Sequence, residues 1–298
     1  MDPPPVTVLG AHAGRSRSGM MGPVAMERGM IGRLPYLGLG SGAPLLFVGG
    51  LSPQSGVEAH GTEWMNASLL EPFAERRRVL FVNRRNGLPR GMSMAELADE
   101  HADAIRSLGA GPVDVAGIST GGSIAQQLAA DHPDVVDRLV LLSTACRLGP
   151  EGRALQRRVA ARIRRGAHRQ ALAVLTAGLV PPRRGRLGAA AFAWLAGPRL
   201  LAGGDDLADM ATTIEAEDAF DLATCRSAIR APTLILAGGA DRFYSPELFA
   251  ETARLIPGSR LRVFEGRGHV TVARHPEWSR EIERFIAEGE RRGDGDAA

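Results

Sequence analysis

Short apolar runs alternate with helix-like segments along most of this 298-residue chain, and this alternation limits the possible folds more than any other feature. The runs are almost continuously apolar, as strands are when a sheet is covered on both faces. A helical segment between two such strands favours a parallel connection. The sequence therefore predicts an α/β fold with a mostly parallel sheet and helices on both sides. The expected strands are residues 44–48 (PLLFV), 78–83 (RVLFVN), 113–118 (VDVAGI), 138–143 (RLVLLS), 233–238 (TLILAG) and 260–266 (RLRVFEG).

Several helix boundaries follow from capping residues. Ser93 and Glu96 have the spacing of a capping box, in which each side chain accepts a hydrogen bond from the other residue's backbone N–H. Ser245 is a candidate N-cap, and Pro246 suits the first helical position. The segment SIAQQLAADHP should end before Pro133, because proline disfavours helical backbone at the preceding residue. These boundaries place helices between the predicted strands.

One long segment, residues 147–222, interrupts the alternation because it contains no convincing strand. It is rich in Ala, Leu and Arg, with breaks at PPRRGR and AGGDD, and is expected to form several helices that lie over the sheet as a cap. The core is then built from residues 26–146 and 223–290. Residues 1–25 mix Pro, Gly and Arg and are expected to be a poorly ordered tail. Met26 is an alternative start of the protein, because strand-like sequence begins there.

Charge and cysteine content narrow the function classes. The net charge is +3 and every basic side chain is Arg, with clusters at 153–169 and 183–186. These clusters allow a nucleic-acid or acidic-lipid patch, but only 5% of residues are aromatic and none lies among the arginines, so a solvated helix face is favoured. No apolar run reaches membrane-spanning length, and two cysteines are too few for a disulfide framework. A cytoplasmic protein without a nucleic-acid partner is expected.

A serine lies between two glycines at the end of the third predicted strand, in Gly117-Ile118-Ser119-Thr120-Gly121. In a G-x-S-x-G sequence between a strand and a helix, the serine occupies a sharp, strained turn, and its hydroxyl points out at the carboxyl edge of the sheet. The flanking glycines let the strand and the helix approach closely. The alternative interpretation is a glycine-rich turn that only packs a helix onto a strand.

A nucleophilic serine needs a base, and the base needs an acid that orients it. The fifth predicted strand is followed by Asp241, and the sixth by His269. Parallel strands bring both residues to the edge that holds Ser119, in the chain order Ser…Asp…His that this architecture uses. Asp241 could instead cap a turn or the next helix, and His269 could be a loop histidine. The rival base is His275, whose position before a proline is typical of a helix boundary.

These features together resemble the α/β-hydrolase superfamily. The matching segments are GSGAPLLFVGG, DVAGISTGGSIAQQLAADHPDVVDRLVLLS, APTLILAGGADRFYSPELF and GRGHVTVARHPEW. They cover about residues 27–146 and 223–287 and leave the strand-free segment where that superfamily places a helical cap. The resemblance implies an eight-stranded sheet and a triad of Ser119 as nucleophile, His269 as general base and Asp241 as its orienting acid, with no cofactor. No histidine spacing indicates a metal site.

The resemblance also implies two backbone N–H groups that stabilise the negative charge developing on the substrate oxygen. One belongs to Thr120 and the other to Leu51, in the loop Gly49-Gly50-Leu51. Related enzymes usually have His-Gly in this loop, and often Asp-x-Arg-Gly-x-Gly after the next strand. This chain has Gly-Gly in the loop and Asn-Arg-Arg-Asn-Gly at residues 83–87. The sequence leaves open how the Leu51 loop is braced.

The predicted function is a cofactor-free serine hydrolase that acts on a small, apolar carboxylic ester or related acyl compound through an acyl-enzyme. Phe192, Trp194 and Leu195 are candidates for the substrate pocket, with packing of the cap onto the sheet as the alternative. The tripeptide DRF at residues 241–243 is similar to C–C bond hydrolases, and GISTGG is similar to cofactor-free haloperoxidases. The alternative from a different class is a ligand-binding member of the fold without turnover.

Overall fold

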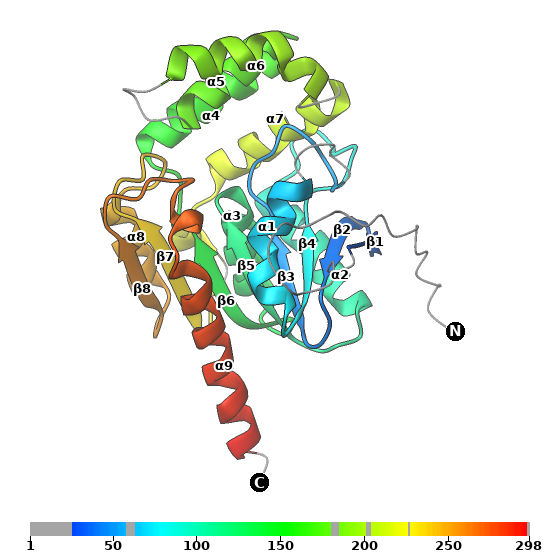
Figure 1. Ribbon diagram of the computed structural model, residues 1–298, viewed down its shortest axis with the longest axis vertical. Coiled ribbons are helices and arrows are strands. Elements are labelled where there is room, and N and C mark those ends of the chain that lie inside the picture. Colours follow the sequence, from blue (N-terminus) through cyan, green and yellow to red (C-terminus); the bar gives the residue numbers. More distant parts are fainter. Residues whose placement is uncertain (1–25, 58–62, 180–184, 201–203, 226, 297–298) are drawn as a thin grey trace, which may run out of the picture.

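An eight-stranded sheet lies at the centre of the protein (Figure 1). The computed structural model describes residues 26–57, 63–179, 185–200, 204–225 and 227–296, and the tail predicted for residues 1–25 lies outside them. The strand order is β1-β2-β4-β3-β5-β6-β7-β8, and the pairs from β4 to β8 are all parallel. The mostly parallel sheet is therefore confirmed. The strands are β1 (Glu27–Ile31), β2 (Leu34–Leu39), β3 (Pro44–Val48), β4 (Arg78–Val82), β5 (Val113–Ile118), β6 (Val136–Leu142), β7 (Thr233–Gly238) and β8 (Arg260–Phe264).

The first two strands form an antiparallel hairpin at one edge of the sheet, and β2 also pairs antiparallel with β4. Gly32, with a φ of +57°, lies in the two-residue turn between Ile31 and Leu34. The sequence does not mark β1 as an apolar run, because an edge strand is only partly covered. Met30, for example, is 56% exposed.

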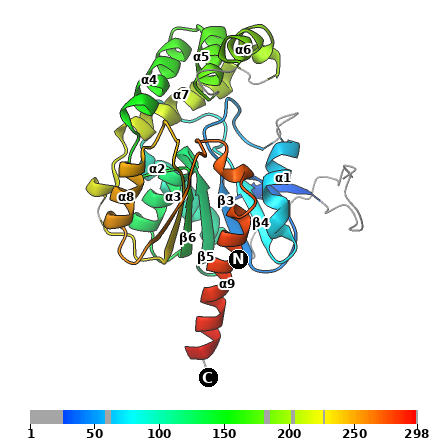
Figure 2. The ribbon, with the colours of Figure 1, turned by 60° about the vertical axis from the view of Figure 1, so that its left-hand side comes forward.

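Helices cover both faces of the sheet (Figure 2). Side chains of β3 alternate between the two faces, so Leu45 and Phe47 pack with the core beneath α1 and α9, whereas Leu46 and Val48 pack with the core beneath α2, α3 and α8. Such double coverage explains why the strands are almost continuously apolar. The covering helices are α1 (Glu63–Ala74) and α9 (Trp278–Asp296) on one face, and α2 (Met94–Ser107), α3 (Thr120–Asp131) and α8 (Pro246–Leu255) on the other.

The predicted helix caps are present. Ser93 Oγ accepts from the Glu96 N–H at 3.2 Å, and the Glu96 carboxylate accepts from the Ser93 N–H at 2.7 Å, which completes the capping box of α2. Ser245 caps α8 with a single bond, in which its Oγ accepts from the Leu248 N–H at 3.4 Å, and Pro246 occupies the first helical position. These contacts join residues three positions apart, so the local sequence is sufficient to specify them.

In the described residues between β6 and β7, four helices are followed by a 3-10 turn. We call the helices the four-helix segment: α4 (Pro150–Arg164), α5 (His168–Leu179), α6 (Arg186–Leu200) and α7 (Gly204–Ala219), followed by η1 (Leu222–Thr224). The segment has a small apolar core of its own and lies beyond one end of the sheet, with α7 nearest to it (Figure 1). None of the helices in the described parts of the chain combines the length and apolar character that a membrane span needs.

Ion pairs join the arginine-rich helix α4 to α7. Arg153 and Arg157 lie 3.4 Å and 2.9 Å from Asp218, and Arg164 lies 2.7 Å from Glu215. Part of the arginine cluster noted in the sequence therefore holds two helices of the four-helix segment together.

Candidate active site

Ser119 lies in a strained backbone turn between β5 and α3. Its φ is +53° and its ψ is −126°, outside the regions that non-glycine residues ordinarily occupy. Its backbone N–H donates to Leu142 O at 3.0 Å and ties the turn to β6. A Cβ on Gly117 would lie 2.5 Å from Gly121 O, and a Cβ on Gly121 would lie 2.3 Å from Val48 O. The turn can form only because both flanking positions are glycine.

Three side chains from distant parts of the chain meet at this turn. Ser119 Oγ lies 2.9 Å from His269 Nε2, and His269 Nδ1 lies 2.9 Å from Asp241 Oδ2. The Asp241 side chain is 0% exposed, and the His269 side chain is 12% exposed. The second Asp241 oxygen accepts from the backbone N–H groups of Phe243 at 2.8 Å and Tyr244 at 3.2 Å. With Nδ1–H donating to the carboxylate, the neutral imidazole presents Nε2 as an acceptor to the serine hydroxyl.

The contacts of Asp241 and His275 bear on the alternatives raised by the sequence. Asp241 does cap its turn, but only with one oxygen, while the other oxygen bonds to His269. His275 follows the 3-10 turn η2 (Val272–Arg274) and lies before α9. The centroid of its ring lies 4.5 Å from that of the Phe264 ring, and its Nδ1 accepts from the Glu277 N–H at 3.2 Å. His275 therefore has the contacts of a helix boundary.

The histidine is held from two sides. The Phe243 ring stacks on the His269 imidazole, with centroids 4.4 Å apart and an interplanar angle of 28°. Ser143 also has a positive φ, of +49°, and its hydroxyl donates a hydrogen bond to His269 O at 2.9 Å. The only sequence signal for Ser143 is its place at the end of a predicted strand, at the same edge of the sheet.

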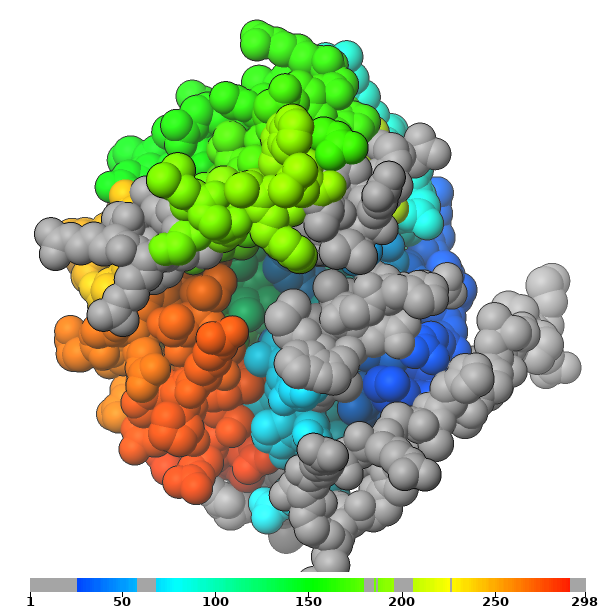
Figure 3. All heavy atoms as spheres, turned by 45° about the horizontal axis from the view of Figure 1, so that its top comes forward, coloured from blue at the N-terminus to red at the C-terminus, as the bar shows by residue number. Residues whose placement is uncertain are grey.

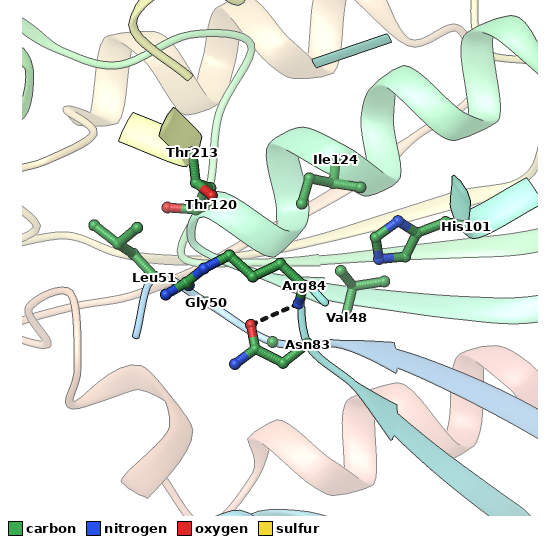
Figure 4. A pocket seen from close by; sticks show the side chains of 10 residues that line it. Val48, Gly50, Leu51, Asn83, Arg84, His101, Thr120, Ile124 and Thr213 are labelled. Atoms are coloured by element: carbon green, nitrogen blue, oxygen red, sulfur yellow. Dashed lines mark hydrogen bonds between the residues drawn. The ribbon is translucent and has the colours of Figure 1, made fainter. Parts of the chain in front are cut away.

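The loop after β3 lies directly against the nucleophile turn. A Cβ on Gly50 would lie 3.2 Å from Ile118 O and 3.3 Å from Ser119 Cβ. Leu51 and Thr120, whose N–H groups are the predicted oxyanion donors, line one pocket together with Gly50 (Figure 4). The Thr120 N–H also belongs to the first turn of α3, where the helix end favours negative charge. The loop after β3 and the first turn of α3 therefore both lie beside Ser119.

Two side chains after β4 brace this loop. Asn83 Nδ2 donates to Gln54 O at 3.0 Å and to Gly56 O at 2.9 Å, and Arg84 Nη2 donates to Ser52 O at 2.7 Å. Both side chains are buried and lie beside the Leu51 loop in Figure 4. Burial lowers the pKa of Arg84 to about 10, although nearby Asp209 and Asp206 raise it, so the guanidinium stays charged at neutral pH. The loop is thus braced by Asn83 and Arg84, which belong to the segment 83–87 that differs from the usual Asp-x-Arg-Gly-x-Gly pattern.

The fold and this site define the class of protein. A mostly parallel sheet with a serine in a strained turn after β5, bonded to a histidine after β8, is the architecture of the α/β hydrolases. Comparison with protein families agrees, because residues 45–282 match the alpha/beta hydrolase family. The chain belongs to this family.

Individual relatives and solved structures are also similar. A pimeloyl-[acyl-carrier protein] methyl ester esterase of Neisseria meningitidis serogroup A is 32% identical over 203 residues, which are 63% of this chain and 61% of that protein. The match therefore spans less than two thirds of that relative. A hydrolase from Pseudomonas aeruginosa PA01 superimposes with a TM-score of 0.66 at 22% identity, over 88% of this chain and 95% of the other. A thermophilic esterase from Thermogutta terrifontis superimposes with a TM-score of 0.63 at 23% identity, over 95% and 98%.

Proposed function

We propose that the protein is a cofactor-free serine hydrolase that cleaves a carboxylic ester through an acyl-enzyme. The observation that carries this proposal is the pair of 2.9 Å hydrogen bonds that links Ser119, His269 and Asp241 at a strained turn. A purely structural turn has no need of a buried carboxylate and an imidazole aligned on its serine. The methyl ester esterase among the relatives supports an ester as the substrate.

In the first half of the reaction, His269 Nε2 takes the proton of Ser119 as Oγ attacks the ester carbonyl. The carbonyl oxygen becomes negatively charged and is stabilised by the N–H groups of Leu51 and Thr120. The imidazolium then donates its proton to the leaving alkoxide oxygen as the C–O bond breaks. The products of this half are the alcohol and the acyl-enzyme.

In the second half, His269 Nε2 takes a proton from water, and the resulting hydroxide attacks the acyl carbon. The imidazolium returns a proton to Ser119 Oγ, and the carboxylic acid leaves. Asp241 keeps its negative charge throughout and stabilises the imidazolium in both halves. Its full burial strengthens this interaction, because water does not screen it.

We assign the four-helix segment as the cap that borders the substrate site, within residues 147–222. Figure 3 supports this role, since the four-helix segment and the orange C-terminal part of the core lie on either side of recessed atoms from the middle of the chain. Phe192, Trp194 and Leu195 on α6 are 60%, 45% and 64% exposed. These three residues remain predicted pocket residues. The proposed substrate is an apolar small-molecule ester. Cys146 and Cys225 are free thiols, which supports the expected cytoplasmic location.

The direct test is hydrolysis of p-nitrophenyl esters of two to twelve carbons by the wild type and by Ser119→Ala. The variant should lose activity completely, and a fluorophosphonate should label only protein that keeps Ser119. Ser259→Ala is the matched control, because its hydroxyl bonds to Ala253 O within the chain and lies outside the proposed site. A burst of p-nitrophenol equal to the enzyme concentration would show the acyl-enzyme. Retained activity in Ser119→Ala would exclude the proposal.

A further inference from the structure

A carboxylate that the proposed mechanism does not use lies behind the nucleophile turn. Glu217, near the end of α7, is 0% exposed. Its Oε2 accepts from Thr120 Oγ1 at 2.7 Å and from Gln156 Nε2 at 2.9 Å. Its Oε1 accepts from Tyr244 OH at 2.9 Å and from Ser123 Oγ at 3.0 Å. One side chain of the four-helix segment thus bonds to α3, α4 and the loop after β7.

The hydrogen bonds of Glu217 match the acceptor capacity of a carboxylate. A carboxylate offers about four acceptor positions, and four donors occupy them. Burial, together with the negative charge of Glu217, raises the pKa of Tyr244, so its hydroxyl keeps its proton and donates it.

The four donors are all neutral groups, so stability alone is a poor reason for this buried charge. A buried carboxylate loses its hydration, and hydrogen bonds to neutral groups only offset that cost. We attribute the role of Glu217 instead to two of its partners, Thr120 and Tyr244, which contact or supply groups of the proposed site. Thr120 supplies the proposed oxyanion N–H. The Tyr244 N–H donates to Asp241 at 3.2 Å, and its ring centroid lies 5.8 Å from that of His269.

We propose that Glu217 is a positioning residue that couples the four-helix segment to the nucleophile turn. By binding the hydroxyls of Thr120 and Tyr244 at once, its carboxylate fixes the distance between the oxyanion side and the acid–base side of the site. It acts through these two residues and does not touch the substrate. The inference rests on the proposed hydrolase function, because it assigns a role within that site.

Glu217→Gln tests the role, since it keeps the shape but replaces one oxygen by an NH2 group that cannot accept. Labelling of Ser119 by a fluorophosphonate and kcat for a p-nitrophenyl ester should both fall by about tenfold or more, with KM changed by less than about twofold. Thermal unfolding measures folding in parallel. Glu215→Gln is the matched control, because Glu215 lies on the same helix but is 40% exposed and pairs with Arg164. The control should label and turn over as the wild type does.

Thr120→Val gives a second, independent measurement, because it removes the hydroxyl but keeps the backbone N–H. It should reproduce most of the loss, and Glu217→Gln added to it should lower the rate by much less than its separate effect. Thr120→Val also carries the test if Glu217→Gln does not fold. Wild-type labelling in folded Glu217→Gln, or effects of the two changes that simply multiply, would overturn the inference. A wild type that is not labelled at Ser119 would overturn the proposed function, and the inference with it.

Discussion

Replacement of Asp241 by Asn tests the acid–base arrangement most sharply. The two side chains have nearly the same shape, but Asn replaces one acceptor oxygen by an NH2 group. In the wild type, one Asp241 oxygen accepts two backbone N–H groups at 2.8 Å and 3.2 Å, and the other accepts one N–H from His269 at 2.9 Å. An NH2 group turned toward the backbone would face two donors, whereas one turned toward the imidazole would face a single donor.

The amide oxygen should therefore stay on the backbone side, with the NH2 group facing His269 Nδ1. His269 can then accept at Nδ1 only by carrying its proton on Nε2, and this tautomer cannot take the proton of Ser119. The Asp241 side chain is 0% exposed, so water cannot restore the lost contact. A wrong tautomer in a Ser-His-Asp triad lowers kcat by about 10⁴-fold, which corresponds to about 5.4 kcal/mol of transition-state stabilisation.

The assay is kcat and KM for p-nitrophenyl acetate from pH 6 to 9, with thermal unfolding as the check on folding. Asp103→Asn is the matched control, because the Asp103 side chain is 80% exposed on α2 and lies 3.6 Å from Arg106 of the same helix. A folded Asp241→Asn protein that keeps more than about a tenth of the wild-type kcat would refute the reasoning, since it would show that His269 holds its active tautomer without the carboxylate.

Three further changes test other parts of the structure. Gly121→Ala should lower the free energy of unfolding by about 2 kcal/mol or more, because its Cβ would lie 2.3 Å from Val48 O and 2.4 Å from Gly49 O. Gly188→Ala is the control, with nothing within 4 Å, and a urea titration in which the two variants match would contradict the close approach. Arg84→Met should lower kcat by about tenfold, because Ser52 O loses its donor and the Leu51 loop loses a brace. An unchanged kcat would mean that Asn83 alone is sufficient to hold the loop in place. Burial lowers the pKa of His101 below its ordinary 6.5, so the unfolded chain binds a proton there that the folded protein does not. The wild type should therefore lose stability relative to His101→Leu as the pH falls below about 6.5, by up to about 1.4 kcal/mol per pH unit, and a difference that does not vary with pH would contradict this assignment.

Local sequence was sufficient to predict six of the eight strands and the N-caps of α2 and α8. The six apolar runs became strands β3 to β8, because burial on both faces leaves a continuous apolar signal. The β1–β2 hairpin was harder to find, since a half-exposed edge strand lacks that signal. The predicted parallel strands also placed Ser119, Asp241 and His269 at one edge, because each follows the carboxyl end of a strand and those ends coincide in a parallel sheet.

The contacts that tune the site were not accessible in this way. Arg84 bonds to a loop 32 residues away, and Glu217 bonds to Thr120 across 97 residues. In the sequence each is one charged residue among many, with no period or spacing to distinguish it from a solvated side chain. The sequence by itself determined which backbone turns and strands form, because those depend on neighbouring residues and on the burial pattern. Only the tertiary structure decided which polar side chains are buried together, because that depends on how distant elements pack.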